Sequence, residues 1–125
     1  MKVKFASLLI CLSLLLCSLS ACAGMGNQSA DVHVFYYTYS DPYISTVRSA
    51  LDAKLKSEGI RFQDHDGNNS QTTQTEQIQT AITKGAKLLV VNIVTTGSDD
   101  AASGIVALAK NAGIPVVFFN REVSD

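Results

Sequence analysis

Beyond residue 22 the sequence contains no cysteine, and the whole chain has no tryptophan and only two prolines. The part after the last cysteine therefore has neither a disulfide framework nor a cysteine metal site. Lys and Arg total 10 and Asp and Glu total 11, which argues against a nucleic-acid-binding protein with its basic patch. Hydrophobic residues make up 46% of the chain, which excludes intrinsic disorder, and 125 residues allow one domain.

The N-terminus has the layout of an export signal. A short basic segment, residues 1–4, precedes an apolar run over residues 5–19. A transmembrane helix needs about 20 apolar residues, so this run is too short to be one. Leu-Ser-Ala-Cys at residues 19–22 resembles a bacterial lipobox, in which small residues precede the cysteine that is lipidated. We therefore expect a lipoprotein signal peptide over residues 1–21 and lipidation of Cys22; an ordinary signal peptide or a membrane anchor is the alternative.

Residues 22–30 are small and polar, which predicts a lipidated N-terminus and tether ahead of a domain over residues 31–125. Cleavage before Cys22 removes two lysines and leaves a small excess of acidic side chains. Such a body has no electrostatic reason to lie on an anionic membrane. We expect an exported protein on the periplasmic or cell-surface side, held to the membrane by its lipid.

The domain alternates predicted strands and helices. Strands are expected over residues 32–39, 60–64, 87–94 and 114–119, and the helices between them end at Gly59, Gly85 and Gly113. The order βαβαβαβ predicts an α/β fold: an open, doubly wound parallel sheet with helices on both faces. The last predicted strand lacks cover, so we expect the chain to form part of the N-terminal lobe of something larger.

Two polar segments are expected to face solvent. The Gln/Thr-rich residues 71–75 are predicted to form a solvated face of the second helix. Residues 65–69 have the composition of a turn, which places His65 in solvent. His33 is expected to lie on the first strand without a chemical role.

Ligands of open α/β sheets bind at the carboxyl ends of the strands. Asp41 and Tyr43 follow the first strand, Asn92 lies in the third, and Asn120 and Arg121 follow the fourth. A carboxylate, amides, a guanidinium and an aromatic ring together suit a polyhydroxylated ligand such as a sugar. The sequence shows neither a Ser/His/Asp arrangement nor a phosphate-binding glycine loop, so we do not expect an enzyme.

Each candidate residue has a structural alternative. Asp41 is also a good N-cap for the first helix, and Tyr43 could pack at that helix start. Asn120 and Arg121 could serve the turn or another lobe. Asn92 is harder to explain structurally, because a buried amide costs free energy unless it forms hydrogen bonds.

These segments together resemble the N-terminal lobe of the galactose/glucose-binding periplasmic proteins, in the type I sugar-binding family. The resemblance spans residues 31–125 and rests on the aromatic first strand with its Ser-Asp-Pro-Tyr continuation, on the apolar strand that contains Asn92, and on Pro-Val-Val-Phe-Phe-Asn-Arg-Glu at residues 115–122. It implies that Asp41 accepts hydrogen bonds from sugar hydroxyls, that Tyr43 stacks on the pyranose, and that Asn92 binds another hydroxyl. The family commonly has Phe where this chain has Tyr43, and Tyr keeps the stacking face.

The resemblance implies a substrate-binding lipoprotein of an ABC sugar importer. Such a protein binds a hexose such as galactose or glucose non-covalently between two lobes and delivers it to the membrane permease. A sugar-sensing receptor for chemotaxis or signalling with the same fold is the alternative. No cofactor and no metal site are expected within this sequence, since the calcium loop of many family members lies in the second lobe.

Overall fold

The computed structural model describes residues 29–123, so the predictions for the signal peptide and for Cys22 lie outside the described residues. Four strands and three helices alternate along this part, as predicted. Their bounds are β1 (Val32–Tyr36), α2 (Pro42–Ser57), β2 (Phe62–Asp66), α3 (Gln71–Thr83), β3 (Leu88–Val91), α4 (Asp99–Ala112) and β4 (Val116–Phe118).

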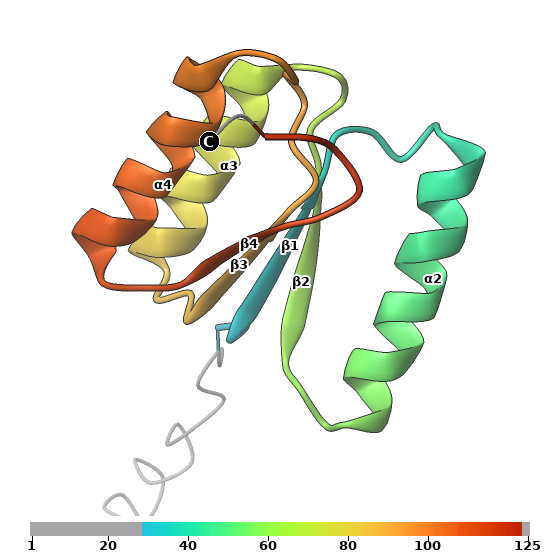
Figure 1. Cartoon of the computed structure of the whole chain (residues 1–125). Coiled ribbons are helices and arrows are strands. Elements are labelled where there is room, and N and C mark those ends of the chain that lie inside the picture. Colours follow the sequence, from blue (N-terminus) through green and yellow to red (C-terminus); the bar gives the residue numbers. More distant parts are fainter. Residues whose placement is uncertain (1–28, 124–125) are drawn as a thin grey trace, which may run out of the picture.

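The strands form one parallel sheet in the order β2-β1-β3-β4. Figure 1 shows α2 on one side of this sheet and α3 with α4 on the other. The predicted doubly wound α/β fold is therefore confirmed. Among residues 29–123, no helix combines the length and the apolar character that crossing a membrane requires.

Local sequence features determine where the helices begin and end. Asp41 caps α2, because its Oδ1 accepts from the Ile44 N–H at 3.0 Å, and Pro42 is the first helical residue. Ser70 caps α3 in the same way through the Thr73 N–H at 3.2 Å. Gly113 ends α4 with φ of 69°, a left-handed conformation that favours glycine.

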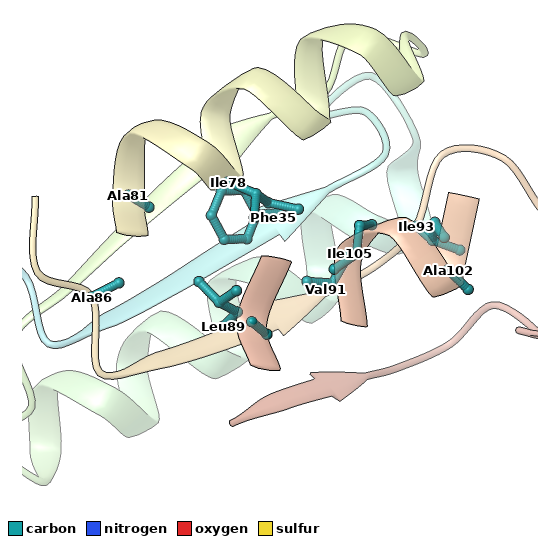
Figure 2. Close-up of a cluster of buried hydrophobic side chains, with 10 residues drawn as sticks. Phe35, Ile78, Ala81, Ala86, Leu89, Val91, Ile93, Ala102 and Ile105 are labelled. Atoms are coloured by element: carbon teal, nitrogen blue, oxygen red, sulfur yellow. The ribbon is translucent and has the colours of Figure 1, made fainter. Parts of the chain in front are cut away.

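The sheet separates two cores of unequal size. The two-helix core lies between the sheet and the helices α3 and α4, and Figure 2 shows its side chains converging from both helices and from β1 and β3. Its buried members are Phe35, Ile78, Ala81, Ala86, Leu89, Val91, Ile93, Ala102, Ile105 and Ala109. The one-helix core lies beneath α2 and buries Val32, Val34, Tyr36 and Ile44. Since apolar burial is the main favourable contribution to folding, most of it comes from the two-helix core.

β4 is a thinly covered edge strand. It pairs only with β3 in the described sheet, and the Val117 side chain is 50% exposed. Figure 1 shows α2 standing over the opposite margin of the sheet, beside β2. This thin cover agrees with the expectation drawn for the last strand.

The prediction that His65 lies in a solvent-exposed turn was wrong. β2 runs from Phe62 to Asp66 rather than over residues 60–64, because the Ile60 N–H still bonds the Leu55 carbonyl at the end of α2. His65 is therefore a half-buried strand residue, and its ring stacks on Phe35 with centroids 4.5 Å apart. The turn itself begins after β2.

The prediction of a solvated face over residues 71–75 was wrong at Gln74, which is fully buried. Its Nε2 donates to the Asn92 carbonyl at 3.0 Å, and its Oε1 accepts from the Val94 N–H at 3.1 Å. Gln71 Oε1 accepts from the Thr95 N–H at 2.9 Å. The two glutamines supply partners to backbone groups that have left the sheet after β3.

Gly67 lies where the chain leaves β2 beside the end of β1. Its N–H donates to the Tyr36 carbonyl at 2.8 Å. A Cβ at this position would lie 2.9 Å from that carbonyl oxygen and 3.0 Å from Val94 Cγ2. Lack of room for a side chain therefore dictates the glycine here.

Candidate functional site

The carboxyl ends of β1, β3 and β4 meet at one edge of the sheet (Figure 1). The segments that leave these ends contain all the predicted ligand-binding residues. Three of them, Asp41, Asn92 and Arg121, converge on Tyr37, the first residue after β1. The side chains of Tyr43 and Asn120 are exposed, and Tyr43 contacts this group only through its backbone N–H, which bonds Asp41.

Tyr37 contacts each of the three residues with a different part of its structure. Its hydroxyl donates to Asp41 Oδ2, and its backbone N–H donates to Asn92 Oδ1 at 3.3 Å. The Arg121 Cζ lies 4.1 Å from the centroid of its ring, within the range of a cation–π interaction. Tyr37 was predicted to lie in the first strand, without a functional role. The one signal in the sequence was its position just past the alternating core pattern of Val34 and Tyr36.

Asp41 serves both the helix and this group. Its Oδ1 caps α2, and its Oδ2 accepts from Tyr37. The Tyr37 hydroxyl and then the Ile44 N–H hold the pKa of the Asp41 carboxyl below its usual value. The group is therefore ionised at neutral pH. A carboxylate has about four acceptor positions, and the Tyr43 N–H also bonds this one, so about one position remains for a ligand.

Asn92 lies just past β3, not inside it, and is fully buried. Its Oδ1 accepts from Tyr37, and its Nδ2 donates to the Phe119 carbonyl at 3.2 Å. The amide thus joins the ends of β1 and β4, a structural role that the sequence did not reveal. One N–H and one lone pair of this amide remain beyond these bonds, and binding of a ligand hydroxyl by Asn92 stays a prediction.

Arg121 hydrogen-bonds the segment that follows β3. Its Nη1 donates to the carbonyls of Ile93 at 2.9 Å and Val94 at 2.6 Å. Asn120, with φ of 62°, turns the chain between β4 and Arg121. Both residues line an open depression together with Thr96, Gly97 and Glu122.

Tyr43 lies in the first turn of α2, and its side chain is 62% exposed. It does not pack into either core, so the structural alternative of packing at the helix start is wrong. Along the chain it lies two residues from Asp41. Among residues 29–123, no group of three or more acidic, histidine or cysteine side chains forms a cluster that could hold a metal ion.

The sequence matches a known protein family and is similar to known proteins of that kind. Residues 32–125 match the family model described as periplasmic binding protein domain. The D-galactose/methyl-galactoside binding periplasmic protein of Haemophilus influenzae is 34% identical over an alignment of 105 residues that covers 78% of this chain and 31% of that protein.

Solved structures give the same picture. An ABC transporter solute binding protein from Mycobacterium smegmatis with bound glycerol has a TM-score of 0.69 at 27% identity, covering 78% of this chain and 33% of that one. The Caulobacter myo-inositol binding protein bound to myo-inositol has a TM-score of 0.68 at 21% identity, covering 85% and 34%, and shows the fold alone. The chain thus spans about a third of the length of these relatives. On the match over residues 32–125, the chain belongs to the periplasmic binding protein domain family.

Proposed function

We propose that this chain supplies the N-terminal lobe of a sugar-binding protein that serves an ABC importer. The observation that carries the proposal is the Asp41 carboxylate, which is ionised and has about one acceptor position left, two residues along the chain from the exposed Tyr43. Sugar hydroxyls donate to carboxylates, and the apolar face of a pyranose rests on an aromatic ring. Family membership and the galactoside-binding relative support the same function.

The proposed ligand is a hexose such as galactose or glucose. In this assignment Asp41 accepts from one hydroxyl, Tyr43 stacks on the ring, and the remaining Asn92 amide N–H donates to another hydroxyl. Asn120 and Arg121 line the rim of the site. Similarity to the galactoside-binding relative supports the hexose, while similar structures are named for other sugars and for myo-inositol.

Binding needs no covalent step, because a second lobe would close over the sugar and exclude water. The protein would be exported and held to the membrane through lipidated Cys22, with the permease of the importer as its partner. Sugar sensing would use the same binding step, with a signalling protein as the partner instead of the permease. Intact mass of the native protein extracted from membranes tests the anchor: a lipid increment on Cys22 is expected, and its absence would remove the anchor from the proposal.

The binding proposal is tested by calorimetry with D-galactose, D-glucose and myo-inositol on the full-length protein. Asp41→Ala should lower hexose affinity by about 10- to 100-fold, because a charge-assisted hydrogen bond to the ligand is lost. It should also cost about 1 kcal/mol of stability through the lost helix cap.

Ser70→Ala is the matched control, because it removes the N-cap of α3 and leaves the site intact. It should cost a similar stability and leave sugar affinity unchanged. If Asp41→Ala bound hexose as tightly as the Ser70→Ala protein, the proposed site would be wrong.

A further inference from the structure

Tyr37 stands at the junction of three elements, and its contacts go beyond what strand formation requires. Its hydroxyl reaches the start of α2, its N–H reaches the residue after β3, and its ring faces Arg121 after β4. The side chain is half-buried, so it has lost part of its freedom before any ligand arrives. We propose that Tyr37 is the positioning residue of the sugar site, an inference that rests on the proposed function.

The first consequence concerns the plane of the Asp41 carboxylate. The bond from the Ile44 N–H holds Oδ1 only, and a carboxyl fixed at one oxygen can still rotate about Cβ–Cγ. The Tyr37 hydroxyl holds Oδ2, so the carboxylate is fixed at both oxygens. Its remaining acceptor position therefore keeps a constant direction, which is the condition for a preorganised binding group.

The second consequence concerns the guanidinium of Arg121. Arg121 is close enough to help lower the pKa of Asp41, yet the ion pairs of the described residues 29–123 do not include the two. The guanidinium instead lies over the Tyr37 ring and donates to two backbone carbonyls. The ring thus keeps Arg121 near the carboxylate without letting it take the position that a sugar would use.

The test compares Tyr37→Phe with Tyr39→Phe. The first variant removes the hydroxyl bonded to Asp41 and keeps the ring and the N–H. The second removes the hydroxyl of Tyr39, which belongs to the same segment. That hydroxyl contacts Arg48, which lies outside the site. Two quantities are measured: the Asp41 carboxyl pKa by carbon NMR without ligand, and D-galactose affinity as a function of pH by calorimetry.

Positioning by Tyr37 predicts a joint change in both quantities. In Tyr37→Phe the pKa of Asp41 should rise, since its largest lowering contact is gone. D-galactose affinity at pH 7 should fall about 10-fold, as expected for a lost hydrogen bond to a charged group. The acid limb of the binding profile should move to higher pH, whereas Tyr39→Phe should match the wild type in all three respects. A residue that only stabilised the fold would shift the melting temperature and leave the acid limb in place.

The outcomes separate this inference from the proposed function. If Asp41→Ala loses binding while Tyr37→Phe keeps the wild-type affinity and acid limb, the function stands and the positioning role is overturned. If the wild type binds none of the three ligands, the proposed function fails, and the NMR titration decides the Tyr37–Asp41 link alone. An unchanged Asp41 pKa in Tyr37→Phe would then overturn that link, and a raised pKa would support it.

Discussion

Two helices cover one face of the sheet and bury ten apolar side chains, whereas α2 covers the other face and buries four. The faces also differ in the ionisable side chains that they hold. The two-helix side holds a histidine pair, with His33 Nδ1 and His65 Nε2 2.9 Å apart. The α2 side holds a carboxyl pair, in which Asp64 of β2 hydrogen-bonds Asp52 of α2. Neighbouring residues of β2 thus place an acid and a base on opposite faces.

Burial shifts the pKa values of His65 and Asp64 in opposite directions. Burial, aided by His33 and Lys84, lowers the pKa of His65 to about 4. Burial and then the contact with Asp52 raise the pKa of Asp64 to about 7, against Arg48 and Lys56. Each group is therefore driven toward its neutral form, as expected when a charged form loses solvation.

The two shifts have opposite effects on stability over the same pH range. Folded Asp64 holds its proton more tightly than the unfolded chain does, so its effect lowers stability as pH rises from about 4 to about 7. Folded His65 holds its proton less tightly, so its effect lowers stability as pH falls from about 6.5 toward about 4. In the wild type these two contributions oppose each other.

The largest effect we expect is a test of the unequal cores. Ile78→Ala in the two-helix core should cost about 3 kcal/mol, because it removes a fully buried side chain and leaves a cavity. Leu51 is a residue of α2 whose side chain packs against the one-helix core and is only partly buried. Leu51→Ala should therefore cost about 1 kcal/mol. Urea unfolding of both variants measures the difference. Equal costs would mean that the one-helix core contributes as much to the free energy of unfolding as the two-helix core does.

Removing the buried acid should reveal the histidine pair. Asp64→Asn should stabilise the protein by about 2 kcal/mol at pH 8, after allowance for partial solvent exposure, because the cost of ionising Asp64 disappears. Its stability should then rise with pH between about 4 and 7, the direction set by His65. Thermal unfolding over that range measures the slope, and a stability that still fell with pH would contradict the assignment.

The reciprocal change should be smaller. His65→Phe keeps an aromatic ring against Phe35 and removes the titrating group. Stability should then fall as pH rises from about 4 to about 7, with a change of about 1 kcal/mol relative to the wild type, since His33 still opposes it. The same unfolding series serves as the measurement. A pH profile identical to that of the wild type would exclude His65 as the opposing group.

The smallest effect concerns Tyr36 in the one-helix core. Its side chain is fully buried, and its hydroxyl has no hydrogen-bond partner among the described residues. Tyr36→Phe should stabilise the protein by about 1 kcal/mol, because the desolvation cost of the hydroxyl is removed. Destabilisation by that amount in urea would show that the hydroxyl is paired in solution.

The order of elements and the helix caps could be predicted because their patterns are local. Asp41 and Ser70 cap helices with their own side chains, and the apolar spacing of each helix needs no knowledge of its neighbours. The bounds of β2 were harder, because a strand was predicted over residues 60–64 and the His65-Asp66 segment resembles a turn; only the pairing with β1 shows that the strand continues to Asp66. The buried role of Gln74 also depends on a distant segment, the chain after β3.

The position of the candidate site could be predicted, whereas the contacts within it could not. Its edge followed from the strand order, and Asp41, Asn92 and Arg121 do lie together there. That they converge through Tyr37 could not be predicted, because the three contacts join residues 4, 55 and 84 positions away in the sequence. The bonds of Asn92 to backbone groups were hidden for the same reason.

Gly67 has a consequence for how this chain can vary. Because any Cβ would press on the Tyr36 carbonyl, every codon change to another amino acid there should be rejected in a mutational scan. Gly104, inside α4, has open space within 4 Å of where a Cβ would stand, and alanine there should be enriched through its higher helix propensity. Gly67 thus has no room for a side chain whereas Gly104 has, and a library built around the candidate site should randomise neither Gly67 nor the turn that depends on it.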